Sequence, residues 1–230
     1  MPRLKNCFLA RVSVQVNYTM ALNPPSRISL ALPGFENIKR AWHSNFETVA
    51  ARLLPGEYFV TLHDEAIYTT LGSCISACIR DRVSGIGGMN HFMLPISTSS
   101  NSWKASDNSA STRYGNYAME HLINDILKNG GKRQNLEAKI FGGGRIIANM
   151  TDVGLRNISF ARDYLQTEGL KITSEDVGET FPRMVAYFPA TGKVRVKRLR
   201  SLHNNTIVEQ EATYLQTIEK KPASGDIELF

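Results

Sequence analysis

The sequence predicts a mixed α/β domain, and three observations support this class. The 230 residues are 42% hydrophobic, which is enough apolar content for one sizeable core or two small ones. Short segments that alternate apolar and polar residues recur along the chain, and two longer segments repeat their apolar residues at helical spacing. Apolar runs stop far short of the roughly 20 residues that a membrane helix needs. We therefore expect a soluble, folded protein and exclude collagen-like structure and disorder throughout.

The two ends of the chain are expected to lie outside the folded domain. Residues 1–35 contain four Lys and Arg but no Asp or Glu, so they supply +4 of the net charge of +6. Polar residues interrupt their apolar stretches, which argues against a secretory signal. We predict a flexible extension over residues 1–45, a folded domain over residues 46–200 and a C-terminal tail over residues 201–230.

The first part of the domain is predicted to consist of strands. Residues 57–62 follow a Pro-Gly turn and have the composition of a strand. Residues 66–80 form two apolar stretches on either side of Gly72-Ser73, which indicates a strand, a turn and a second strand. Residues 86–95 predict another strand, poor in side chains at its start and closed by its final proline.

The second part alternates predicted helices and strands. Residues 96–112 are rich in Ser, Thr and Asn, so we expect an exposed loop. Apolar residues at helical spacing predict helices over residues 114–127 and 155–168, and glycine follows each of them. Further strands are predicted at residues 136–141, 170–175, 183–188 and 193–198.

The three cysteines favour a reducing compartment, because Cys7, Cys74 and Cys78 do not form a paired secreted framework. Cys74 is the candidate nucleophile. It follows Gly72-Ser73 at the predicted turn, where backbone N–H groups are able to face the sulfur and a nearby oxyanion. Burial as a small hydrophobe is the more common fate of such a cysteine. A partner base is therefore needed to support the catalytic interpretation.

His91 is the candidate base. It lies in an apolar segment on the strand that follows the cysteine-bearing one, and an antiparallel pairing of the two strands would bring His91 and Cys74 together. A histidine on an apolar strand is more often a satisfied core residue. The coincidence of both unusual residues on neighbouring strands shifts the balance toward a Cys-His pair.

Metal and nucleotide binding are weaker uses of these residues. On a strand, Cys74 and Cys78 would lie about 13 Å apart, too far for one zinc ion, and on a helix the further ligands are missing. We assign Cys78 to packing. The Gly142-Gly143-Gly144 run lacks the Lys-Ser/Thr of a phosphate loop, so close backbone packing is the default interpretation.

A basic strand near the end of the predicted domain offers a possible docking surface. Its cations are Lys193, Arg195, Lys197, Arg198 and Arg200. A solvated face is the simpler interpretation, and an anionic partner is the sharper one. No aromatic residues are interleaved with these cations, so the segment does not favour nucleic acid.

Several separated blocks, in order, resemble the chemoreceptor glutamine deamidase family, CheD. The blocks are Leu71-Gly72-Ser73-Cys74, the run Ile86 to Pro95 with its histidine seventeen positions after the cysteine, Leu136 to Gly143, Gly154-Leu155-Arg156-Asn157, Glu175 to Gly178, Arg183 and Thr191-Gly192-Lys193. They cover roughly residues 45–200 and are far more specific together than any one glycine motif.

The resemblance implies a cysteine hydrolase that converts glutamine side chains of methyl-accepting chemotaxis receptors to glutamate with release of ammonia, a protein-glutamine glutaminase. Cys74 would be the nucleophile and His91 the base, with no metal or organic cofactor. The family also uses a threonine shortly before the cysteine. Tyr68 stands six positions before Cys74, where some members carry it, so Thr69 is the candidate here, although a shift of one residue reverses the face of a strand.

The resemblance also implies an architecture and a set of partners. The expected fold is an α/β (α+β) sandwich of mixed β-sheets with helices packed outside, similar to bacterial deamidating toxins. A receptor is the expected protein substrate, in the cytoplasm and without membrane insertion, and the site should be shallow. The main alternative is an adaptor that binds and regulates a chemotaxis phosphatase; a cysteine protease or a transglutaminase-like enzyme is a second one. Gly178-Glu179 departs from the Gly-Gly common in the family, which affects a loop more than the chemistry.

Overall fold

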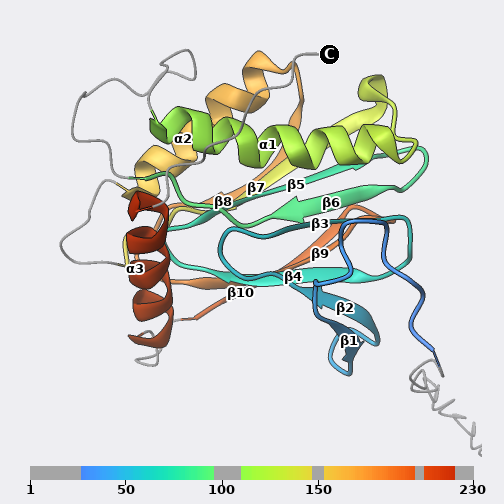
Figure 1. Cartoon of the computed structure of the whole chain (residues 1–230), viewed down its shortest axis with the longest axis horizontal. Helices are drawn as coiled ribbons and strands as arrows, with labels where there is room; N and C mark the ends of the chain where they lie inside the picture. Colours follow the sequence, from blue (N-terminus) through green and yellow to red (C-terminus); the bar gives the residue numbers. More distant parts are fainter. Residues whose placement is uncertain (1–26, 96–109, 147–152, 200–204, 221–230) are drawn as a thin grey trace, which may run out of the picture.

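Two five-stranded sheets form the centre of the structure, a computed structural model that describes residues 27–95, 110–146, 153–199 and 205–220 (Figure 1). The first sheet has the order β1-β2-β4-β9-β10. Its strands are β1 (Arg40–His43), β2 (Thr48–Arg52), β4 (Ala66–Leu71), β9 (Arg183–Phe188) and β10 (Lys193–Arg198). The second sheet has the order β3-β6-β5-β7-β8. Its strands are β3 (Tyr58–Thr61), β6 (Gly87–Asn90), β5 (Ile75–Asp81), β7 (Leu136–Gly142) and β8 (Ile172–Val177).

Both sheets are mixed. In the first, β2 and β4 run parallel and the other neighbours are antiparallel. In the second, β7 and β8 run parallel, and the rest are antiparallel. The expected sandwich of mixed sheets is therefore confirmed.

Helices cover one side of the sandwich and one of its ends. Helices α1 (Ala110–Lys128) and α2 (Val153–Thr167) lie over the outer face of the second sheet, and α3 (Asn205–Lys220) stands across one end of the strands (Figure 1). A 3₁₀ turn at Arg133–Asn135 leads into β7. None of these described helices combines the length and the apolarity that crossing a membrane requires.

The central strands are buried because both of their faces are covered. Six of the seven residues of β5 are buried, although an alternating strand exposed on one face would bury only half of them. The edge strand β10 instead alternates exposed and half-buried residues, and its Lys and Arg side chains lie on the exposed positions. The sequence-based interpretation of β10 as a basic strand with a solvated face is consistent with this pattern.

The predicted strands and helices between residues 57 and 198 are all present, with bounds that differ by a few residues. The predictions for the two ends were wrong in part. Residues 1–45 were expected to be a flexible extension, but β1 pairs antiparallel with β2, and Phe35 is buried against Tyr58 and Phe59. The expected tail contains α3, whose Leu215 and Ile218 join the core.

Some predictions fall on residues that the structure does not describe. Most of the expected loop over residues 96–112, from 96 to 109, lies outside the described residues, and so do Cys7 and Arg200. Helix α1 begins at Ala110, inside the segment that was expected to be loop.

Candidate active site

Cys74 and His91 lie close together, Cys74 just before the start of β5 and His91 just after the end of β6. Cys74 stands in the turn between β4 and β5, and His91 directly follows β6. Their neighbours Ile75 and Phe92 form an antiparallel bridge with N–H to carbonyl distances of 2.9 and 3.0 Å. The predicted antiparallel arrangement therefore brings the sulfur and the imidazole to the same place, as expected from the order of the strands.

Thr69 completes a chain of polar contacts behind His91. Its Oγ1 lies 2.7 Å from His91 Nδ1 and donates a hydrogen bond to the carbonyl oxygen of Leu53 at 2.8 Å. Thr69 is buried, whereas its neighbours Tyr68 and Thr70 are half-buried, so the alternation of β4 turns Thr69 toward the interior. The structure therefore brings the side chain of Thr69 into hydrogen-bond contact with His91, although Tyr68 also lines the cavity beside it.

A set of backbone N–H groups beside Cys74 points at one anion. The N–H groups of Gly72 and Cys74 donate to Oε1 of Glu211 at 2.8 and 3.2 Å. The N–H and Oγ of Ser73 donate to the other oxygen, Oε2, at 2.7 and 2.6 Å. Three consecutive N–H groups that converge on a carboxylate make the geometry that stabilises an oxyanion.

The carbonyl groups of the same turn are held from the opposite side. Gly143 N–H and Gly144 N–H donate to the carbonyls of Cys74 and Gly72, each at 2.7 Å. Asn157 of α2 donates its Nδ2 hydrogen to the carbonyl of Ser73 at 2.8 Å. These hydrogen bonds hold the carbonyl groups of the turn on the side away from Glu211. The N–H groups of the turn face Glu211, which is the orientation that binds an anion.

Close approach explains the glycine run after β7. Gly142 has φ of 111°, and a Cβ there would lie 2.2 Å from the carbonyl oxygen of Cys74. The interpretation of the run as close backbone packing is confirmed. Cys78 is buried in the middle of β5, in agreement with its predicted packing role.

Burial sets the protonation state of the Cys-His pair. Burial raises the pKa of the Cys74 thiol well above its ordinary value, and the neighbouring Glu211 carboxylate raises it further. Burial also lowers the pKa of His91 to about 3. With α3 in this position, the pair is therefore a neutral thiol beside a neutral imidazole. Removal of the carboxylate would favour the thiolate.

Cys74, His91 and Glu211 also have the residue types of a metal site. The Cys74 sulfur, a ring nitrogen of His91 and a carboxylate oxygen of Glu211 lie within 4.8 Å of one another. A carboxylate has about four lone-pair positions, and Glu211 accepts four hydrogen bonds from the turn. Binding a metal through Glu211 would displace one of these donors, so the geometry favours an anion-binding interpretation.

The predicted shallow site is not what the structure has. Cys74 is fully buried and only 2% of His91 is exposed, because α3 lies over the turn and places Glu211 against it. A cavity of about 220 Å³ lies beside His91, and its lining includes Thr69, His91 and Glu211 but not Cys74. The correction has a simple cause, since the segment that was expected to be a tail covers the site.

Glu211 is the residue that the sequence reasoning missed. It lies 137 positions after Cys74, in the segment that was assigned to the tail. One signal for it was present. Glu211, Leu215 and Ile218 are spaced four and three residues apart on one face of a helix, which places a carboxylate in line with apolar residues that must be buried.

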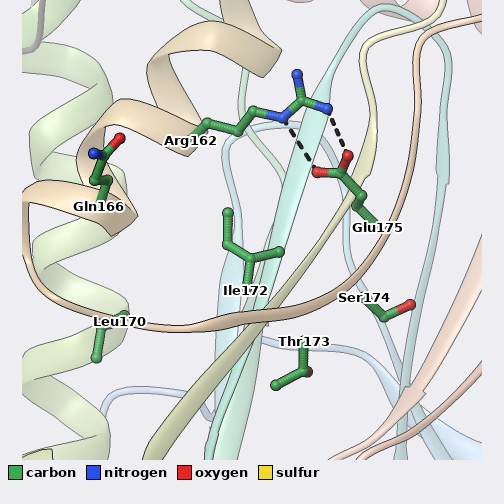
Figure 2. Close-up of a pocket in the computed structure, with 7 residues that line it drawn as sticks. All are labelled: Arg162, Gln166, Leu170, Ile172, Thr173, Ser174 and Glu175. Atoms are coloured by element: carbon green, nitrogen blue, oxygen red, sulfur yellow. Dashed lines mark hydrogen bonds and ion pairs between the residues drawn. The ribbon is translucent and has the colours of Figure 1, made fainter.

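A larger hollow of about 610 Å³ lies at the β8 edge of the second sheet (Figure 2). It is lined by Arg162, Gln166, Leu170, Ile172, Thr173, Ser174 and Glu175. Arg162 of α2 and Glu175 of β8 form an ion pair across it at 2.6 Å. Its lining contains no histidine, whereas His91, Thr69 and Glu211 line the smaller cavity, which is therefore the better candidate for chemistry.

Comparison with known proteins finds relatives over most of the chain. The family model described as CheD chemotactic sensory transduction matches residues 93–198. The chain is 53% identical over 200 residues to the probable chemoreceptor glutamine deamidase CheD of Halorhodospira halophila, covering 86% of this chain and 93% of the relative. It is 50% identical over 210 residues to the relative of the same name from Hahella chejuensis, covering 91% and 99%.

The structure brings Cys74, His91 and Thr69 together at one end of two mixed sheets, and the relatives are named as deamidases, a class of hydrolase. At this level of identity and coverage the chain belongs to the CheD family. Among solved structures, a Neisseria meningitidis protein of the DUF152 family matches with a TM-score of 0.35 and 13% identity, covering 54% of each chain. That likeness is too weak to carry an argument, and the expected similarity to deamidating toxins stays a prediction.

Proposed function

We propose that the protein is a cysteine-dependent protein-glutamine deamidase that acts in the cytoplasm on chemoreceptors. The names of its relatives support this reaction and substrate. The observation that carries the proposal is the convergence of three N–H groups on a carboxylate beside a buried sulfur and imidazole. A carboxylate is the product of glutamine deamidation, and an oxyanion on the same carbon precedes it.

The first half of the reaction forms a thioester. His91 takes the thiol proton of Cys74, and the sulfur attacks the amide carbon of the substrate glutamine. The tetrahedral intermediate carries its negative charge on oxygen, where the N–H groups of the turn stabilise it. His91 then gives its proton to the departing nitrogen, which leaves as ammonia.

The second half returns the enzyme to its starting state. His91 removes a proton from water, which attacks the thioester carbon, and the same N–H groups stabilise the second oxyanion. The carbon–sulfur bond breaks and His91 returns the proton to Cys74, which leaves a glutamate side chain and the free thiol. Thr69 acts on the reaction through His91, because it contacts Nδ1 of the ring.

Mass spectrometry of a chemoreceptor cytoplasmic fragment tests the proposal. Each conversion of glutamine to glutamate adds about 1 Da, and the Cys74→Ala variant lacks the attacking sulfur. We expect conversion with the native protein and none with the variant. Equal gain with both proteins rejects covalent catalysis. Peptide cleavage, or incorporation of an added amine, reveals a protease or a transglutaminase instead.

The basic strand β10 is proposed to help dock an acidic receptor surface. Lys193, Arg195, Lys197 and Arg198 lie on exposed positions of this edge strand, and Arg195 also contacts the ring of Phe188. Charge reversal at Arg195 and Lys197 is expected to slow deamidation of the intact receptor, with a larger effect at low salt. An unchanged rate at both salt concentrations rejects this docking surface.

The relatives' names favour the enzyme over the adaptor that was predicted as the alternative. A phosphatase partner is therefore not needed to account for the site. In this proposal Cys74 is the nucleophile, His91 the base and Thr69 the orienting group, and none of these roles requires a second protein.

A further inference from the structure

Helix α3 places a carboxylate where the proposed reaction leaves its product. Glu211 accepts hydrogen bonds from the N–H groups of Gly72, Ser73 and Cys74 and from the Ser73 hydroxyl, at 2.6 to 3.2 Å. One of its oxygens lies within 4.8 Å of the Cys74 sulfur and of a ring nitrogen of His91. Donors that stabilise an oxyanion also bind the carboxylate that follows it, because both place negative charge on oxygen of the same carbon.

The identity of the side chain matters as much as its charge. Glutamate is the residue that deamidation of glutamine produces, with the same number of carbons between the backbone and the carboxylate. Glu211 therefore has the length and chemistry of a product side chain, and it is presented from a helix. Because Glu211 is carried by helix α3, a helix is the kind of segment that fits over the site.

The surface that α3 covers, called the seat of α3 below, contacts one face of this helix. Glu211, Leu215 and Ile218 are buried along this face, and Tyr214 contacts Tyr114 of α1 through its hydroxyl. Exposed residues, Glu209 among them, lie on the opposite face. The seat thus recognises an amphipathic helix that buries apolar side chains and directs one amide or carboxylate at the sulfur.

We propose that the seat of α3 is the docking surface for a substrate helix, with the reactive glutamine in the place of Glu211, so that α3 is a tethered product mimic that competes with substrate. This inference rests on the proposed deamidase function and adds the conformation of the substrate and the origin of its competitor. Because α3 is tethered to the site by the same chain, its effective concentration there is high, and it competes well with a separate substrate.

The electrostatics of the site agree with a resting state. The carboxylate of Glu211 contributes to the raised pKa of Cys74, so the docked helix disfavours the nucleophilic thiolate. Gly72 adds a geometric constraint: a Cβ at this position would lie 2.1 Å from Cδ1 of Ile146 and 2.7 Å from Oε2 of Glu211. The absence of a side chain at Gly72 therefore leaves room for both of these neighbours.

The first experiment measures deamidation of the receptor fragment by full-length variants. Glu211→Ala is expected to raise kcat/KM at least tenfold, because substrate no longer competes with a bound carboxylate. Glu209→Ala is the matched control, since it removes the same residue type from the exposed face of the same helix, and it should leave kcat/KM unchanged. Ile218→Ala loosens α3 without touching the site and should raise kcat/KM in the same direction.

Equal kcat/KM for the native protein, Glu211→Ala and Ile218→Ala overturns the inference while leaving the proposed function intact. Thermal melting of each variant checks that it is folded, and the rate of Cys74 alkylation reports whether the site has opened. Faster alkylation in Glu211→Ala than in Glu209→Ala is the expected result.

The second experiment decides the case in which no protein, native or variant, deamidates the receptor fragment. Glu211→Gln places an amide at the site within the chain itself. The sulfur of Cys74 attacks its carbon, ammonia leaves, and water hydrolyses the thioester, so the side chain returns to glutamate with a gain of about 1 Da. The Cys74→Ala/Glu211→Gln double variant and the exposed Glu209→Gln variant should keep their amides.

Conversion at position 211 supports helix docking at the site even if the receptor is not the substrate. Persistence of that amide, together with an unmodified receptor fragment, overturns both the inference and the proposed function. Tandem mass spectrometry of the peptide that contains residues 209 and 211 assigns the gain to one position.

Discussion

Thr69 fixes the tautomer of His91. The Thr69 hydroxyl has one proton, and it is donated to the carbonyl oxygen of Leu53, which only accepts. The 2.7 Å contact between Thr69 Oγ1 and His91 Nδ1 must then be a hydrogen bond donated by the imidazole. In the neutral ring this leaves Nε2 with a lone pair, and Nε2 is buried without a hydrogen-bond partner among the described residues. The ring is thereby prepared to accept a proton from Cys74.

Thr69→Val tests this orienting role. The substitution keeps the shape of the side chain but leaves His91 Nδ1 and the Leu53 carbonyl unpaired, which costs about 1–3 kcal/mol of stability. We expect kcat for receptor deamidation to fall on the order of 10²-fold, because the base loses its tautomer and position. Thr69→Ser restores the hydroxyl and should restore most of kcat. A purely structural role would give loss of stability without a change in kcat or in its pH profile.

Burial of His91 predicts a specific loss of stability in mild acid. The pKa of His91 is about 3 in the folded protein, against about 6.5 for an unperturbed histidine. Above pH 6.5 both states are neutral and the full stability is present. Below it, the unfolded state binds a proton that the folded state does not, so stability falls by about 1.4 kcal/mol per pH unit down to about pH 3. By pH 5 the loss from His91 is about 2 kcal/mol.

Urea unfolding at pH 7.5 and pH 5.0 measures this loss. His91→Gln removes the titrating ring, so the difference in free energy of unfolding between the two pH values should shrink by about 2 kcal/mol relative to the native protein. An equal difference in both proteins would show that the acid sensitivity arises from other groups.

Asn157 is predicted to position the turn that carries Cys74. Its side chain donates to the carbonyl of Ser73 and accepts from the N–H of Leu94 at 2.9 Å. Asn157→Asp has no hydrogen to donate and sets a negative charge against the Ser73 carbonyl. We expect kcat to fall at least about tenfold, since the N–H groups lose their alignment. Asn129→Asp, at the end of α1, is the control and should keep kcat. A change in KM without a change in kcat in Asn157→Asp would argue against a positioning role.

Local sequence pattern predicted much of the fold, but it did not predict that helix α3 covers the site. The alternation around Gly72-Ser73 predicted β4 and β5, and the next apolar segment gave β6, so Cys74 and His91 were placed on antiparallel neighbours. The family resemblance implied a sandwich of mixed sheets, but local pattern did not assign each strand to its sheet, because the successive strands β3 and β4 belong to different sheets. Glu211 reaches the turn from 137 or more residues away, and no local pattern encodes such a contact.

The register of Thr69 illustrates the same limit. Sequence spacing left Tyr68 and Thr69 as neighbours on opposite faces of one strand. The pairing of β4 with β2 and β9 decides which face is inside, and both partners are distant in the chain. Only this long-range pairing turns Thr69 toward His91.

Two glycines with similar backbone angles separate steric from conformational effects. Gly142 has φ of 111° and Gly130 has φ of 104°, but a Cβ at Gly130 would meet nothing within 4 Å. Gly130→Ala should cost about 1–2 kcal/mol for the angle alone. Gly142→Ala adds a clash with the Cys74 carbonyl and should cost more than about 3 kcal/mol, with loss of deamidation. Comparable costs in chemical denaturation would contradict the close approach.

The departure from the family pattern at Glu179 predicts a stabilising substitution. Glu179 follows Gly178 and adopts φ of 66°, a left-handed conformation that favours glycine, while its carbonyl accepts a hydrogen bond from the N–H of Arg145 at 2.8 Å. Glu179→Gly relieves the backbone but increases the entropy of the unfolded chain, so we expect a net gain of about 0.5 kcal/mol. Glu209→Gly, in the exposed face of α3, lacks that relief and should lose about 0.5–1 kcal/mol. Urea denaturation of the two variants beside the native protein measures both changes, and a loss of stability in Glu179→Gly would mean that the left-handed conformation does not strain this loop.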